Sequence, residues 1–274
     1  MITEGERENM DIGRTAGPTP YSEVNALLLF MLARVQEVLG EELVGFYLYG
    51  SLSLGDFDPQ SSDIDFLIVT EHDIVGKLLD DLRDMHVTIA ANGLRYADHL
   101  EGSYIPRRAL RRYYPQDATH PTIGIDWEFH VEWHGSNWIL ERHIVRESGI
   151  VVWGPPPGTL IDPVAPQAMR AAVCEKLHDF WSEQLSGPEW LHPRDYQAFA
   201  VLTLCRALYT LSYGDVVSKP RAASWACQAL DTRWRPTIER ALIWRRQHVQ
   251  ENDMSESLAF LRYAFARGLE LCDQ

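Results

Sequence analysis

Residues 45–70 read GFYLYGSLSLGDFDPQSSDIDFLIVT, and this stretch decides the fold. The aromatic and aliphatic residues before Gly50 predict a β-strand that stops at Gly50-Ser51. A loop rich in Gly, Asp, Pro and Ser follows, and the apolar run at 63–69 predicts a second strand. The stretch therefore predicts two strands joined by a tight turn and a polar loop.

Two aspartates lie at the start of the second strand. Side chains alternate along a strand, so Asp63 and Asp65 share one face, and their charges repel each other. A hard divalent cation such as Mg²⁺ relieves this repulsion, and it usually arrives with a substrate phosphate. Gly50 would let the backbone approach that phosphate, and Ser51 would add a hydroxyl donor. The simpler alternative is a β-hairpin with two acidic residues near its mouth.

The composition narrows the class of partner. The chain has 274 residues, of which 46% are hydrophobic, and a formal net charge of −14. These values suit a globular protein with one large domain or two ordinary ones. Acidic proteins seldom bind DNA or RNA, because that affinity depends largely on Lys and Arg meeting phosphates. We therefore expect a small-molecule partner, no nucleic acid, and a monomer or weak homodimer.

The cysteines and the hydropathy of the chain indicate the cellular compartment in which the protein is expected. The cysteines lie in expected helices without CxxC spacing, which predicts reduced, packed thiols at Cys174, Cys205, Cys227 and Cys272. No apolar run approaches membrane-spanning length, and the N-terminus has no hydrophobic signal core. We therefore expect no membrane association and a cytoplasmic location.

Periodicity divides the chain into two parts. Residues 1–20 are polar and predict a mobile tail, and the run GPPPG at 154–158 is the strongest linker signal. A first domain (21–157) is expected to contain helices at 21–40, 73–90, 107–114 and 136–147 and strands at 44–49, 63–69, 99–105, 124–133 and 149–153, with a loop at 115–121. A second domain (158–274) is expected to be a bundle with helices at 166–185, 194–213, 219–230, 236–248 and 255–271. The predicted fold class is α+β.

Glu101 is the candidate general base. It lies in an expected strand between Leu100 and Tyr104, where a charge is out of place unless it faces a site. Transfer of a phosphate-containing group to a hydroxyl needs such a carboxylate, because the attacking hydroxyl must lose its proton. The alternative is a surface strand in which Glu101 faces water.

Two cations in the helical half are candidate anion ligands. Arg206 lies in an apolar helix, so it requires a nearby anion, which is either a buried carboxylate or a nucleotide phosphate. Lys219 follows Ser218, a good helix N-cap, and so lies where a helix start favours anions. The alternative for Lys219 is an ordinary exposed lysine.

These features together resemble known enzymes. The stretch at 49–66 resembles the signature of the DNA polymerase beta-like nucleotidyltransferases. That signature is a hydrophobic residue followed by Gly-Ser, a polar loop, and then Asp-hydrophobic-Asp-hydrophobic. From Tyr21 onward the chain is also similar to the streptomycin/spectinomycin-type aminoglycoside adenylyltransferases. The segments that carry this likeness are 48–51, 62–65, 100–105, 153–155, 161–164, 201–206, 218–219 and 222–226.

The resemblance implies a polymerase beta-like nucleotidyltransferase domain followed by an all-α bundle, with ATP between them. It implies that Asp63 and Asp65 hold Mg²⁺ and that Glu101 is the catalytic base. It also implies that Arg206 and Lys219 bind the ATP phosphates. Nucleotide contacts are further expected from Gly50, Ser51 and Ser62.

The acceptor site is less well matched to the family. The resemblance implies a tryptophan after the base and acidic residues near the start of the second bundle helix. Trp127, Glu101 and Asp195 are the corresponding candidates for binding a cationic acceptor. Glu189 is the other carboxylate nearby, and Arg194 places a positive charge beside this expected cation site.

The sequence therefore predicts an ATP- and Mg²⁺-dependent enzyme that transfers AMP to a hydroxyl of a small cationic acceptor. An aminoglycoside or aminocyclitol antibiotic is the expected acceptor. Two alternatives stay open at this point: the same transfer to another metabolite or to a protein hydroxyl, and a non-catalytic nucleotide-binding module.

Overall fold

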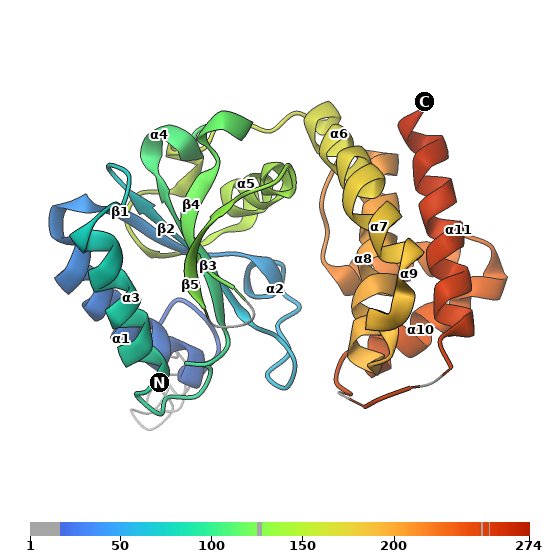
Figure 1. Ribbon diagram of the computed structural model, residues 1–274, viewed down its shortest axis with the longest axis horizontal. Coiled ribbons are helices and arrows are strands. Elements are labelled where there is room, and N and C mark those ends of the chain that lie inside the picture. Colours follow the sequence, from blue (N-terminus) through green and yellow to red (C-terminus); the bar gives the residue numbers. More distant parts are fainter. Residues whose placement is uncertain (1–16, 125–127, 248, 252) are drawn as a thin grey trace, which may run out of the picture.

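The computed structural model describes residues 17–124, 128–247, 249–251 and 253–274. Its N-terminal half contains one mixed, six-stranded sheet with the order β5-β4-β3-β2-β1-β6 (Figure 1). β2 and β3 pair in parallel, and the other neighbouring strands pair antiparallel. The strands are β1 (Leu43–Leu48), β2 (Ile64–Thr70), β3 (Leu100–Pro106), β4 (Thr119–Ile123), β5 (Phe129–Trp133) and β6 (Ile150–Trp153).

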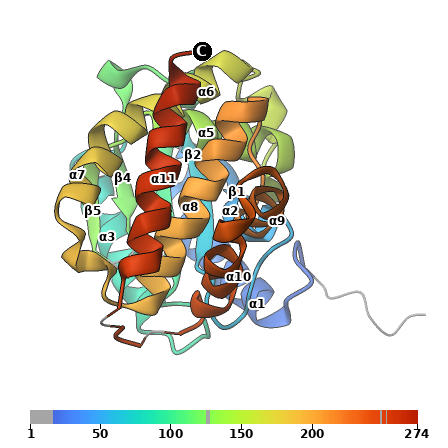
Figure 2. The same ribbon diagram turned by 90° about the vertical axis from the view of Figure 1, so that its right-hand side faces the viewer.

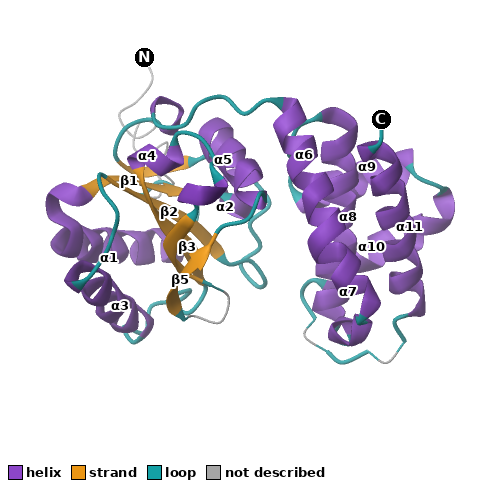
Figure 3. Ribbon diagram, turned by 45° about the horizontal axis from the view of Figure 1, so that its top comes forward, coloured by secondary structure: helices purple, strands orange, loops and turns teal. Residues whose placement is uncertain are grey.

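Helices cover both faces of this sheet (Figures 1 and 3). The even-numbered side chains of β2 enter an apolar core beneath α1 (Ser22–Leu39) and α3 (Lys77–Ala90). Leu67 and Val69 face the opposite way, into a core that includes α5 (Asn137–Ser148). The strict alternation expected for β2 is confirmed, and it puts the odd-numbered Asp65 on the α5 face.

The stretch at 45–70 forms the predicted pair of strands. β1 and β2 are antiparallel, with Leu48 opposite Phe66. Between them, the expected tight turn is a single helical turn, α2 (Gly50–Ser53), followed by the polar loop. The arrangement places Gly50 directly beside the start of β2.

The region after β3 differs from expectation. Residues 107–114 contain only a short helix, α4 (Arg107–Leu110), and β4 takes the last three residues of the expected 115–121 loop. Pro121 suggested a loop because it cannot donate a ladder hydrogen bond. The strand tolerates it because β4 pairs with β3 only through Thr122 and Ile123, so Pro121 lies beyond that ladder. The prediction of a loop was wrong for residues 119–121.

The C-terminal half is the expected helical bundle, with α8 packed against α6, α9, α10 and α11 (Figure 2). The helix expected at 166–185 is divided by a π-helical segment into two. The bundle helices are α6 (Pro166–Lys176), α7 (Ser182–Ser186), α8 (Arg194–Tyr213), α9 (Lys219–Ala229), α10 (Arg235–Trp244) and α11 (Ser255–Cys272). Among the described residues, no helix is long and apolar enough to cross a membrane.

The two halves share an apolar core on the α5 face of the sheet. Trp138 and Ile144 of α5 lie there together with Met169 and Val216, which come from the C-terminal half. This contact joins the bundle to the face of the sheet that carries Asp65.

The expectation of four reduced thiols was wrong for one pair. Cys174 of α6 and Cys272, the last residue of α11, form a disulfide with a Cα–Cα distance of 5.8 Å. Cys205 and Cys227 are free. The pair lies 98 residues apart, and it comes together only because α6 packs against α11. Cysteine spacing alone does not determine such a pairing.

Candidate functional site

The parallel pairing of β2 and β3 brings the predicted metal ligand and the predicted base together. Asp65 is the direct register partner of Glu101, so both side chains leave the sheet on the α5 face. Asp63 lies immediately before β2 at the same end of the sheet. Asp63 and Asp65 thereby form one acidic cluster with Glu101, which lies almost forty residues later in the sequence.

Gly50 lies against this cluster and cannot be replaced without disturbing it. Its φ of +58° is in the left-handed region, and an added Cβ would lie 1.9 Å from Asp65 Oδ2. The neighbouring Ser51 hydroxyl is buried and has no hydrogen-bond partner among the described residues. A buried hydroxyl without a partner is costly, and a bound phosphate oxygen would satisfy it.

Burial and mutual repulsion shift the pKa values of the cluster upward. Burial, and then the charges of Glu101 and Glu141, raise the pKa of Asp65 well above its usual value. Burial, with smaller contributions from Asp63 and Glu141, raises the pKa of Glu101 to about 7. The folded protein therefore concentrates negative charge where a cation would stabilise it.

Glu141 of α5 is a member of the site that sequence reasoning missed. It lies near Asp65 and Glu101, whose pKa values it raises, and near two cations of the bundle. Burial raises the pKa of Glu141, whereas Arg206 and Lys219 lower it. The available signal was a carboxylate within the otherwise apolar run Trp-Ile-Leu-Glu at 138–141.

Lys219 faces the acidic cluster from the start of α9. The Ser218 hydroxyl accepts a hydrogen bond from the Arg221 N–H at 3.4 Å, which confirms the predicted N-cap. Lys219 Nζ lies 4.4 Å from the centroid of the Phe199 ring. Burial and the positive charge of Arg206 lower the pKa of Lys219 to about 8, although the carboxylates opposite act to raise it. Lys219 therefore lies between Arg206 of the bundle and the carboxylates of the sheet half, and its role as an anion ligand remains a prediction.

Arg206 is half-buried on α8 near Glu141 and Lys219. It forms no ion pair within 4.0 Å in the part of the chain that the structure describes. The buried Glu141 carboxylate, whose pKa the charge of Arg206 lowers, is one nearby anion of the kind that the sequence required. The role of Arg206 in nucleotide binding remains a prediction. A guanidinium near a lysine is an arrangement suited to a polyphosphate.

Comparison with known proteins shows what the chain is similar to. Residues 159–267 match the model of the aminoglycoside adenylyltransferase C-terminal domain, and residues 32–103 match the nucleotidyltransferase domain. An aminoglycoside (3'') (9) adenylyltransferase of Shigella flexneri is 27% identical over 87% of this chain and 90% of its own. The spectinomycin 9-adenylyltransferase of Campylobacter jejuni is 23% identical over 85% of this chain and 91% of its own.

The chain is therefore similar to the aminoglycoside adenylyltransferases over most of its length. A crystal structure of the spectinomycin adenyltransferase of Enterococcus faecialis, determined with ATP and spectinomycin, has the same fold. The TM-score is 0.69 at 16% identity, over 88% of this chain and 98% of that one. The predicted α+β class, the nucleotidyltransferase domain, the helical C-terminal region and the assignment as an enzyme are confirmed.

The remaining predicted site residues, Ser62 and Asp63, lie just before β2. The Ser62 hydroxyl accepts a hydrogen bond from the Asp58 N–H at 3.0 Å, so it also shapes the loop before β2. Asp63 Oδ1 lies 3.3 Å from Nδ1 of His99, at the edge of the cluster. The roles of Ser62 in nucleotide binding and of Asp63 in metal binding remain predictions.

Of the residues expected to bind the acceptor, Asp195 and Glu101 lie in the described part of the chain. Asp195 lies in the first turn of α8, and Trp127 lies outside the described residues. Arg194, whose charge opposed a cation site, pairs with Glu251 at 3.0 Å and lies 5.0 Å from the Trp244 ring centroid. The positive charge of Arg194 is thus neutralised by Glu251 within the bundle.

The acidic cluster suits Mg²⁺ in the way nucleotidyltransferases use it. No group of three or more His, Cys, Asp or Glu side chains among the described residues is arranged to hold a metal unaided. Mg²⁺ ordinarily takes one or two carboxylates and completes its shell with substrate phosphates and water. Asp63 and Asp65 have the hard oxygen donors for that share of the ligands, and the raised pKa of Asp65 reflects a site where a cation would be stabilising. Their role in metal binding remains a prediction.

Proposed function

We propose that the enzyme transfers AMP from ATP to a hydroxyl of a small cationic acceptor of the aminoglycoside or aminocyclitol class. The observation that carries the proposal is the pairing of Asp65 with Glu101 on parallel strands, opposite Lys219 and Arg206 of the bundle. One side supplies carboxylates for metal and proton transfer, and the other supplies cations for a triphosphate.

ATP is held between these two sets of side chains. Lys219 and Arg206 neutralise the phosphates from the bundle, and the Ser51 hydroxyl donates from the sheet side. Because Gly50 has no side chain, the backbone at this position can lie directly against the Asp65 carboxylate. Asp63 and Asp65 would hold Mg²⁺, which when bound supplies positive charge for the attacking and leaving oxygens.

Glu101 takes the proton of the acceptor hydroxyl. The hydroxyl oxygen forms a bond to the α-phosphorus as the bond to the β-phosphate oxygen breaks, and pyrophosphate leaves. A base with a pKa of about 7 is well matched to proton transfer near neutral pH. The products are the AMP ester of the acceptor and pyrophosphate, with the proton on Glu101.

A cationic acceptor is favoured by charge. The chain carries a net charge of −14, and Glu101 and Glu141 concentrate negative charge near the reacting centre. Asp195, at the start of α8, and Trp127 are proposed to bind an acceptor amine. Because ATP is supplied inside the cell, we propose a cytoplasmic reaction, in which the Cys174–Cys272 disulfide would be exposed to a reducing environment.

A pyrophosphate-release screen tests this function. The protein is incubated with ATP, Mg²⁺ and a panel of aminoglycosides and aminocyclitols that includes streptomycin and spectinomycin. Neutral polyols of similar size serve as controls for acceptor charge. We expect release that depends on ATP and on a cationic acceptor. Absence of release with every cationic acceptor, or equal release with the neutral controls, would contradict the proposal.

Arg206→Ala should abolish most of the thermal stabilisation that Mg-ATP confers. Without nucleotide, its melting temperature should stay close to wild type, because Arg206 forms no ion pair with a described residue. Loss of a charge-assisted hydrogen bond weakens binding by about 1.5–3 kcal/mol, or roughly 10- to 100-fold. Arg262→Ala, which removes an exposed cation from α11, is the matched control. Equal Mg-ATP stabilisation in the Arg206 variant and wild type would assign Arg206 a structural role.

Glu141→Gln should separate nucleotide from acceptor binding. The change removes a negative charge that competes with the phosphates for Arg206 and Lys219. A single charge at this range is worth about 1 kcal/mol, so ATP should bind roughly fivefold more tightly. A cationic acceptor should bind more weakly by a similar factor. Calorimetry with each ligand measures both, and weaker ATP binding would show that Glu141 instead orients the two cations.

A further inference from the structure

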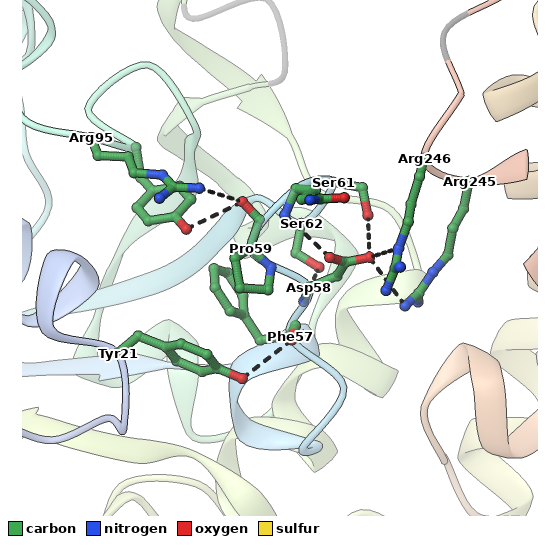
Figure 4. Close-up of polar contacts among 11 residues, drawn as sticks. Tyr21, Phe57, Asp58, Pro59, Ser61, Ser62, Arg95, Arg245 and Arg246 are labelled. Atoms are coloured by element: carbon green, nitrogen blue, oxygen red, sulfur yellow. Dashed lines mark hydrogen bonds and ion pairs between the residues drawn. The ribbon is translucent and has the colours of Figure 1, made fainter. Parts of the chain in front are cut away.

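The loop between α2 and β2 joins the two halves of the protein outside the acidic cluster (Figure 4). Asp58 of this loop is only 4% exposed. Its carboxylate accepts hydrogen bonds from Arg246 and Arg245, which directly follow α10 of the bundle; the Arg245 Nη2 to Asp58 Oδ2 distance is 3.4 Å. A buried carboxylate of the sheet half is thus paired with two guanidinium groups of the bundle.

Asp58 also closes the loop that leads to Asp63. Its carbonyl accepts from the N–H groups of Ser61 and Ser62, at 3.1 and 2.9 Å. Its N–H donates to Ser62 Oγ at 3.0 Å. Its carboxylate accepts from the Gln60 N–H at 3.1 Å and from Ser61 Oγ at 3.0 Å. Residues 58–62 therefore form a closed turn, and the position of Asp58 determines the position of the backbone that leads into Asp63.

Contacts with the sheet half fix the other side of the same loop. Arg95 and Tyr96 both donate to the Pro59 carbonyl, at 3.1 and 3.2 Å, and Tyr21 Oη donates to the Phe57 carbonyl at 3.3 Å (Figure 4). The loop is thus held from two directions. Only the contacts from the bundle can transmit a displacement of that half to the loop.

The contact between Asp58 and the arginines is an ion pair. Burial acts to raise the pKa of Asp58, but hydrogen bonds from Gln60 and Arg246 outweigh it, and the pKa is lowered. A buried, ionised carboxylate that loses its partners is left with an unpaired charge, which is strongly unfavourable. The loop and the end of α10 are therefore expected to move together.

We propose that Asp58 is a positioning residue that couples the helical bundle to the metal-binding aspartates. Arg245 and Arg246 hold Asp58, and the turn closed by Asp58 fixes the approach to Asp63. The bundle carries the cations for the triphosphate, so this clamp keeps them in one arrangement with the metal ligands. The effect on turnover rests on the proposed function, whereas the mechanical coupling does not.

Hydrogen–deuterium exchange tests the coupling without an acceptor. Arg246→Gln should speed exchange of the Ser61 and Ser62 amides roughly tenfold, although the substitution lies in the other half. The matched control is Asp215→Ala. It removes the His143 Nε2 to Asp215 Oδ1 contact of 3.1 Å, which also joins the two halves but does not touch the loop. Unchanged loop exchange in Arg246→Gln, or an equal increase in the control, would overturn the proposal.

The Mg²⁺ requirement tests the consequence for catalysis. Asp58→Asn and Arg246→Gln should each raise the Mg²⁺ concentration for half-maximal pyrophosphate release roughly tenfold, and the double variant should be no worse than either. Arg240→Gln, which breaks the 2.5 Å Arg240–Glu256 pair within the bundle, is the control. A lower melting temperature with an unchanged Mg²⁺ requirement would overturn the positioning role. If wild type released no pyrophosphate, the proposed function would fail, and exchange would still decide the coupling.

Discussion

Glu101→Gln is expected to lower the single-turnover rate of AMP transfer by about 10²–10⁴-fold while leaving ATP affinity close to wild type. The amide has the shape of the carboxylate but cannot accept the proton of the attacking hydroxyl. ATP should still be bound through Arg206 and Lys219. Calorimetry with ATP and single-turnover kinetics on the same preparation measure the two quantities separately. Binding of a cationic acceptor should weaken, because a negative charge is lost beside it.

The control for this variant is Glu71→Gln. Glu71 follows β2 at the opposite end of the strand and pairs with Arg107 at 3.2 Å on the surface. Its substitution should leave both the rate and ATP affinity unchanged. A Glu101 variant with wild-type turnover would remove Glu101 from the mechanism. A joint fall of ATP affinity and melting temperature would assign it a structural role.

Asp65→Asn is expected to reduce turnover by at least about 10³-fold, because a metal ligand worth several kcal/mol to the reacting charges is lost. Asp63→Asn should act in the same direction. Gly50 leaves space for either side chain at position 65, so the fold should be retained. Near-wild-type turnover of either variant in Mg²⁺ would show that the metal site lies elsewhere.

Stability gives an independent measurement on Asp65→Asn. The pKa of Asp65 is raised in the folded protein, and that of Glu101 is raised to about 7, so the folded state binds these protons more tightly than the unfolded chain. The contribution of these two groups to stability without metal is therefore fully present at low pH and is lost as pH rises from about 4 through 7. The Asn variant should melt roughly 2–4 °C above wild type at pH 8 without Mg²⁺, with a smaller difference at pH 5. A lower melting temperature at pH 8 would contradict the repulsion.

Local sequence patterns predicted the centre of the site because they are set by strand geometry. Alternation alone placed Asp65 opposite the apolar side chains of β2, and the position of Glu101 among apolar residues marked it as facing a site. The N-cap at Ser218 placed Lys219 at a helix start. Each of these placements depends on residues adjacent in the chain. The roles of Glu101 and Lys219 came from the family resemblance and remain predictions.

Features that depend on packing between distant segments were missed. Glu141 becomes part of the site only because α5 covers the face that carries Asp65. The Cys174–Cys272 disulfide requires α6 to lie against α11, and the sequence separation of 98 residues carried no signal of it. Asp58 looks like an ordinary turn former, and its pairing with Arg245 and Arg246 follows from where α10 ends.

The most direct test of the account follows the AMP group itself. The protein is incubated with Mg²⁺, ATP labelled at the α-phosphorus and either spectinomycin or streptomycin, and the products are separated and weighed by mass spectrometry. The account predicts label bonded to a hydroxyl of the acceptor in one-to-one ratio with pyrophosphate, and none with Asp65→Asn. Label that stays in ATP, or is found only in free AMP with every cationic acceptor tried, would contradict it.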